Sequence, residues 1–77
     1  MIESRPIHEK LLIVRTLFDF DFRCYPKVAE RLRERGVRVT VGGLRTYAER
    51  LRNRLERNDP IAKQLLDKAL EGLNNAG

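Results

Sequence analysis

The chain has 77 residues, a net charge of +5 and a hydrophobic content of 42%, which together predict one small folded domain rather than a disordered segment. Its single cysteine, Cys24, excludes an internal disulfide, and with the single histidine, His8, it provides too few ligands for a zinc site. The first residues lack the pattern of a secretory signal, and no apolar run approaches the roughly 20 residues that span a bilayer. We therefore expect a cytoplasmic protein without a metal or a cofactor.

Apolar spacing predicts a first helix over about residues 5–20. Ser4 is its candidate N-cap, and Pro6 suits its first turn. The expected buried stripe comprises Ile7, Leu11, Val14, Leu17 and Phe18, and Leu12 and Ile13 widen it. The stretch "LFDFDFRCYP" alternates like a strand, but it has no partner strand. We therefore expect a frayed helix end and a loop whose Phe rings cover the core.

A second helix is predicted over about residues 26–35. It begins at Pro26 and ends before Gly36, because glycine can adopt the left-handed conformation that closes a helix. Its apolar face consists of Val28, Ala29 and Leu32. The next residues, "GVRVT", are expected to form a turn that directs Val37 and Val39 into the core.

Two further helices complete the expected fold. Thr40 is a good N-cap for a third helix that begins at Val41. Its buried stripe comprises Leu44, Tyr47, Ala48, Leu51 and Leu55. Asn58 is expected to stop this helix, and Asp59 and Pro60 to begin a last helix over about residues 60–73. That helix carries Ile61, Leu65, Leu66, Ala69, Leu70 and Leu73 on one side.

These elements predict an all-α fold, in which residues 1–77 form one compact domain of three to four helices. The apolar side of the last helix has two interpretations of equal weight. It either closes the core of the monomer or pairs two copies in a homodimer.

Positive charge is concentrated in the middle of the chain. Between Arg23 and Arg57 there are eleven Lys or Arg residues and four Glu residues, an excess of seven positive charges. The segments on either side each carry a net charge of −1. Ten of the eleven cations are arginine, whose planar guanidinium suits phosphates and guanine edges. This distribution indicates a nucleic-acid partner more than a solvated surface.

The segment "YPKVAERLRERGVRVTVGGLRTYAERLRNRL" resembles the helix-turn-helix of bacterial and phage DNA-binding regulators, with the motif spanning about residues 26–57. Part of it also looks like small plasmid-encoded regulators, whose motif often reads "L-x-x-x-G-x-x-(I/V)-(S/T)". The chain departs from the compact motif because Gly36 comes three residues later than usual, which lengthens the first helix. The resemblance implies a small transcriptional regulator that binds double-stranded DNA through its second motif helix.

The face of the third helix opposite its apolar stripe contains no aliphatic side chain. The candidate base-reading residues on and beside it are Gly42, Gly43, Arg45, Thr46, Glu49 and Arg50. The candidate phosphate-binding residues are Lys27, Arg31, Arg33, Arg35, Arg38 and Asn53. The two glycines have two interpretations: close approach of the backbone to DNA, or tight contact between helices. They are not a nucleotide-binding loop, because neither "GxxxxGK(S/T)" nor "GxGxxG" is present.

Two other functions compete with sequence-specific DNA binding. One is a basic module that binds DNA nonspecifically or binds RNA, and the other is an adaptor or inhibitor that offers its Arg-rich helices to an acidic protein. Enzymatic activity is not expected, because Cys24 and His8 lack a third residue that would orient them as nucleophile and base.

Overall fold

The computed structural model describes residues 2–75, and the side chains of residues 2–71. A short 3-10 turn, η1 (Ile2–Ser4), precedes four α-helices. These are α1 (Ile7–Asp19), α2 (Tyr25–Glu34), α3 (Val41–Glu56) and α4 (Pro60–Asn75). No strand occurs within residues 2–75. The predicted all-α fold is confirmed, and each predicted helix is present with ends within two residues of those expected.

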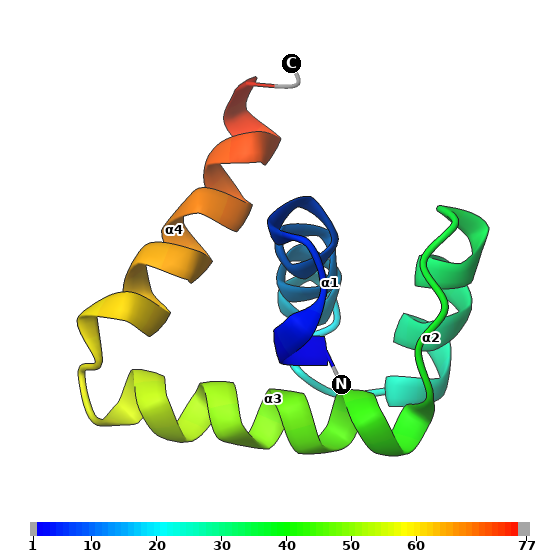
Figure 1. Ribbon diagram of the computed structural model, residues 1–77, viewed down its shortest axis with the longest axis horizontal. Coiled ribbons are helices and arrows are strands. Elements are labelled where there is room, and N and C mark those ends of the chain that lie inside the picture. The colour runs from blue at the N-terminus through cyan, green and yellow to red at the C-terminus, as the bar shows by residue number, and fades with distance from the viewer. Residues whose placement is uncertain (1, 76–77) are drawn as a thin grey trace.

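The arrangement leaves α3 at one edge of the molecule. Figure 1 shows α1, α2 and α4 on the same side of α3, with α1 between α2 and α4. Helix α1 packs against both of these neighbours, while α3 contacts α2 at one end and α4 at the other. The opposite side of α3 has no helix over it (Figure 1). None of the described helices is long and apolar enough to cross a membrane.

Three helices end with the same backbone device, a residue in the left-handed conformation. Asp21 follows α1, Gly36 follows α2 and Asn58 follows α3, with φ of 55°, 83° and 59°. After α2, the N–H of Gly36 donates to the carbonyl of Arg33 at 3.0 Å, and the N–H of Val37 donates to the carbonyl of Leu32 at 2.9 Å. This pair of bonds is the Schellman motif, and it turns the chain so that Val37 is buried. The predicted stops at Gly36 and Asn58 are therefore confirmed.

The starts of α3 and α4 are also as predicted. The hydroxyl of Thr40 accepts a hydrogen bond from the N–H of Gly43 at 2.9 Å, and Oδ1 of Asp59 accepts one from the N–H of Ile61 at 2.9 Å. The prediction that Ser4 caps α1 is wrong. Ser4 lies in η1, and Pro6 occupies the N-cap position of α1. The 3-10 turn changes the chain direction before α1 begins, and no sequence signal distinguishes that turn from a helix start.

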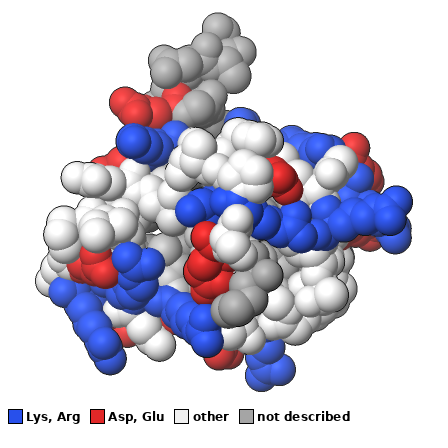
Figure 2. All heavy atoms as spheres, in the orientation of Figure 1, with Lys and Arg blue, Asp and Glu red and all other residues white. Residues whose placement is uncertain are grey.

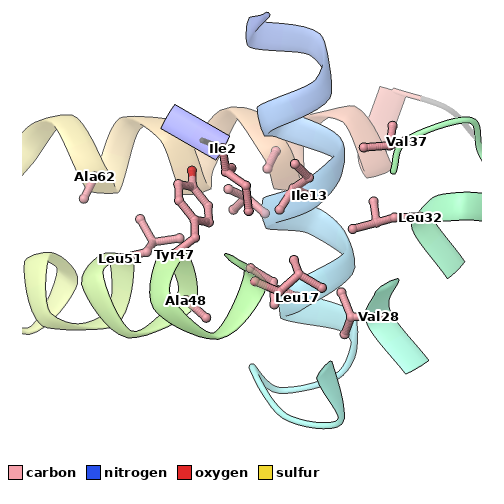
Figure 3. Close-up of a cluster of buried hydrophobic side chains, with 13 residues drawn as sticks. Ile2, Ile13, Leu17, Val28, Leu32, Val37, Tyr47, Ala48, Leu51 and Ala62 are labelled. Atoms are coloured by element: carbon pink, nitrogen blue, oxygen red, sulfur yellow. The ribbon is translucent and has the colours of Figure 1, made fainter. Parts of the chain in front are cut away.

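The core draws on all four helices and on η1. Its buried hydrophobic members are Ile2, Ile13, Val14, Leu17, Val28, Leu32, Val37, Leu44, Tyr47, Ala48, Leu51, Ala62 and Ala69. Figure 3 shows these side chains meeting in the space between α1, α2 and α3, with Ala62 on the side of α4 that faces α3. Phe20 and Phe22 pack against this core from the loop after α1, as predicted.

The predicted stripe of α1 is partly wrong. Ile7 and Phe18 are exposed and Thr16 is buried, contrary to the prediction, whereas Ile13 is buried as expected. The reason is that α1 packs against both α2 and α4. The two neighbours together cover a wider part of α1 than the single apolar stripe that the sequence predicts. Helix α4 buries Ala62 and Ala69 against its neighbours and leaves Ile61 exposed. Pairing of two copies through α4 stays a prediction.

Candidate nucleic-acid interface

The uncovered face of α3 is the main candidate site. Leu44, Ala48 and Leu51 hold the other face of the helix in the core and are at most 2% exposed. The residues on the uncovered face are exposed: Gly42, Arg45, Thr46, Glu49, Arg50 and Asn53. Gly43 is half-buried. The helix therefore presents exposed hydrogen-bonding groups outward, and no other described helix lies over this side of α3 (Figure 1).

The two arginines expected to read bases lie at opposite edges of this face. At 100° per residue, Arg45 and Arg50 are separated by about 140° around the helix, and Thr46 lies between them. Nε of Arg45 is 3.5 Å from Oε1 of Glu49, and Nη1 of Arg50 is 3.2 Å from Oε1 of Glu3. Solvent-exposed ion pairs typically contribute little to the stability of the fold. Each arginine can therefore leave its carboxylate partner for a stronger acceptor. Both guanidinium groups can therefore turn to an external ligand.

Glu3 brings a negative charge from η1 to the edge of α3. Its carboxylate accepts a hydrogen bond from its own backbone N–H and another from Arg50, and these bonds hold the pKa of Glu3 below its usual value. The carboxylate is therefore ionised at neutral pH. On the core side of the helix, burial raises the pKa of Tyr47, so that its hydroxyl is neutral.

The structure separates the two interpretations of the glycines. A Cβ on Gly42 would have no atom within 4 Å, and a Cβ on Gly43 would lie 2.9 Å from Oγ1 of Thr40. Gly43 thus makes room for the hydroxyl that caps its own helix. An added Cβ would meet no atom of another helix at either position, so tight helix–helix contact does not explain these glycines. Nothing within the described chain requires glycine at position 42.

The predicted phosphate-binding residues are all exposed, but they do not form one group. Arg33 and Arg38 line the same groove, of about 550 Å³, between α2 and the turn that precedes α3. Around α2, Lys27 and Arg31 lie about 120° and 160° from Arg33, so they project from the opposite flank. Arg35 is at the carboxyl end of α2, and Asn53 lies on the uncovered face of α3. The structure therefore divides these cations between the groove, with Arg33 and Arg38, and the other flank of α2, where Lys27 and Arg31 are neighbours one turn apart.

One basic residue that the sequence did not single out joins this region. The guanidinium of Arg5 donates to the carbonyl of Arg38 and pairs with Glu9 at 2.9 Å. A second groove, of about 360 Å³, lies beside the first and is lined by Ile2, Arg5, Arg38, Val39, Thr40 and Gly43. Figure 2 shows the resulting belt of Lys and Arg side chains, which runs across this face from α1 to α2. Arg5 and Arg38 are 33 residues apart, so no local pattern could reveal their contact.

The described residues hold no cluster of three or more His, Cys, Asp or Glu side chains that could bind a metal ion. Cys24 is exposed at the start of α2, and His8 is in the first turn of α1. His8 is therefore at the amino end of α1, whereas Cys24 follows its carboxyl end. The structure does not bring them together as a nucleophile and a base.

Comparison with protein-family models, with curated proteins and with solved structures gives no match for this chain. The resemblance of residues 25–55 to helix-turn-helix regulators therefore stays a prediction. The chemistry of the exposed surface is what indicates a function.

Proposed function

We propose that this protein binds double-stranded DNA in a sequence-specific manner and acts as a small transcriptional regulator. The observation that carries the proposal is the uncovered face of α3, which offers donors and acceptors along its length while its other face is fixed in the core. An α-helix fits the major groove of B-DNA, where each base pair presents a distinct pattern of donors and acceptors. Residues near the amino end of such a helix are the ones that approach the bases.

In this arrangement Arg45 bonds the two acceptors of a guanine, and Thr46 contacts a base edge or a thymine methyl group. Glu49 accepts a hydrogen bond from the amino group of a cytosine. Arg33 and Arg38, which share one groove, bind phosphates and fix the position of α3 on the duplex. The excess of seven positive charges between Arg23 and Arg57 attracts the phosphate backbone of any duplex, whatever its base sequence.

Selection from a random duplex library with the purified protein tests this function directly. A specific binder enriches a defined sequence and prefers it to scrambled duplex and to single-stranded RNA at the same salt concentration. Equal retention of all duplexes indicates the nonspecific module, and preference for RNA indicates an RNA-binding function. Failure to bind any nucleic acid at low salt, with binding to an acidic protein, supports the adaptor instead.

Replacing Gly42 with alanine separates DNA binding from stability. No atom lies within 4 Å of the added Cβ, and alanine is favoured over glycine in a helix by up to about 1 kcal/mol. We therefore expect the melting temperature of the variant to be unchanged or higher. If the backbone at this position lies against the duplex, the added methyl group should weaken binding to the selected sequence. Thermal unfolding and fluorescence anisotropy measure the two effects, and unchanged affinity would show that DNA does not approach Gly42.

Replacing Glu3 with glutamine is expected to strengthen DNA binding. The change removes a carboxylate from the edge of α3 and releases Arg50, which Glu3 holds at 3.2 Å. Because exposed ion pairs contribute about 0.2–1 kcal/mol, the expected gain is roughly 1.4- to 5-fold. Glu71→Gln makes the same change of charge on α4 and is the matched control. Equal gains in the two variants would mean that only net charge matters.

A further inference from the structure

A small cleft between α1 and α4 gathers cationic side chains that the proposed DNA interface does not use. It is lined by His8, Leu11, Leu12 and Arg15 from α1 and by Lys68 and Ala69 from α4, and its volume is about 190 Å³. In Figure 1 these two helices extend away from α3, so the cleft is on a different part of the surface from the uncovered face of α3. A ligand in this cleft would contact two helices at once.

The cations of this cleft have no anionic partner in the described chain. Nε of Arg15 is buried and has no hydrogen-bond partner among residues 2–71. None of the ion pairs between described residues involves His8, Arg15 or Lys68. Arg15 and Lys68 therefore line the cleft without a described carboxylate to neutralise them, and such a setting attracts an anion.

We propose that this cleft binds a small organic anion, with the anionic oxygens held by Arg15 and Lys68. The guanidinium offers several donors in a planar fork and the ammonium offers three, which matches a carboxylate or a phosphate group. The imidazole of His8, which also lines the cleft, adds a ring N–H donor. This site does not depend on the proposed DNA binding.

The apolar residues that line the cleft indicate the chemistry of the non-anionic part of the ligand. Leu11, Leu12 and Ala69 are apolar and offer no hydrogen bond to a second polar group. A cavity of about 150 Å³ is enough to hold benzene in a protein, so the volume here accommodates a single ring or a short aliphatic chain beside the anionic group. The ligand is therefore an aromatic or short-chain carboxylate, or the corresponding phosphate monoester.

Nuclear magnetic resonance of the full chain tests the site, because the Nε–H of Arg15 can be followed directly. The probes are phenyl phosphate, benzoate, inorganic phosphate and the neutral benzyl alcohol. We expect phenyl phosphate or benzoate to shift the Arg15 Nε–H signal in a saturable manner, and the tighter of the two identifies the anionic group. Inorganic phosphate should bind at least fivefold more weakly, since it cannot contact the leucines, and benzyl alcohol should leave the signal unchanged.

Two variants on α4 show whether the site is specific. Lys68→Gln is expected to raise the dissociation constant at least fivefold, whereas Lys63→Gln, which removes the same charge from another exposed position of α4, should not change it. Arg15→Lys keeps the charge, removes Nε and should also weaken binding, with circular dichroism confirming that it folds. Equal weakening by Lys63→Gln and Lys68→Gln, or an Arg15 signal that none of the probes shifts in a saturable manner, would overturn the proposal.

Discussion

Replacing Leu44 with alanine is expected to lower the free energy of unfolding by about 2–5 kcal/mol. Leu44 is completely buried and is part of the stripe by which α3 packs on the core, so the truncation leaves a cavity. A domain of 77 residues has a total stability of about 4–12 kcal/mol. The loss is therefore a large share of the total, and denaturation with urea, followed by circular dichroism, measures it.

Val41→Ala is the matched control for this change. Val41 opens the same helix, but it is 42% exposed and contributes little to the core. We expect its free energy of unfolding to change by no more than about 0.5 kcal/mol. Because each kcal/mol shifts the melting temperature of so small a domain by about 4–8 °C, the two variants should be easy to distinguish. Equal losses would contradict the packing of α3 through Leu44.

Replacing Arg45 with alanine is expected to cost about 1–3 kcal/mol of binding free energy on the selected DNA sequence, or roughly 5- to 150-fold in affinity. The side chain is exposed and pairs with Glu49 on the same helix, so the fold should not change. On scrambled duplex the loss should be much smaller, since a contact to a base edge carries the sequence preference. Titrations of both duplexes at one salt concentration measure the difference.

Arg33→Ala removes the same charge from the groove between α2 and the following turn and is the control for Arg45. As a phosphate contact, Arg33 should contribute equally to all duplexes. Its loss should also reduce the slope of log affinity against log salt by about one. If Arg45→Ala behaves in the same way as Arg33→Ala, α3 does not read bases through Arg45, and the proposal of sequence-specific binding fails in its present form.

The helices and most of their ends could be predicted because their signals are local. Thr40, Gly36 and the sequence Asn58-Asp59-Pro60 each act within a few residues of their own position, through a side-chain cap, a left-handed turn or a fixed proline angle. The uncovered face of α3 was predictable for a related reason. A helix with apolar residues on one face only, including Leu44 and Leu51, places that face inward whatever packs against it.

What could not be predicted depends on contacts between distant parts of the chain. The burial of Thr16 and the exposure of Phe18 follow from the position of α1 between two helices, which its own periodicity does not encode. The angular separation of Arg33 and Lys27 follows from helix geometry, but which of the two flanks of α2 borders a groove depends on where the turn before α3 lies. The pairing of Glu3 with Arg50 joins residues 47 positions apart.

The attachment of η1 has a practical consequence for how the protein can be joined to others. Ile2 is 7% exposed, Glu3 pairs with Arg50 and Arg5 bonds the carbonyl of Arg38, so residues 2–5 are held against α3 and against the turn that precedes it. A tag or partner domain fused ahead of residue 2 would begin next to α3. It would compete for the space that a duplex needs, even with the rest of the fold intact.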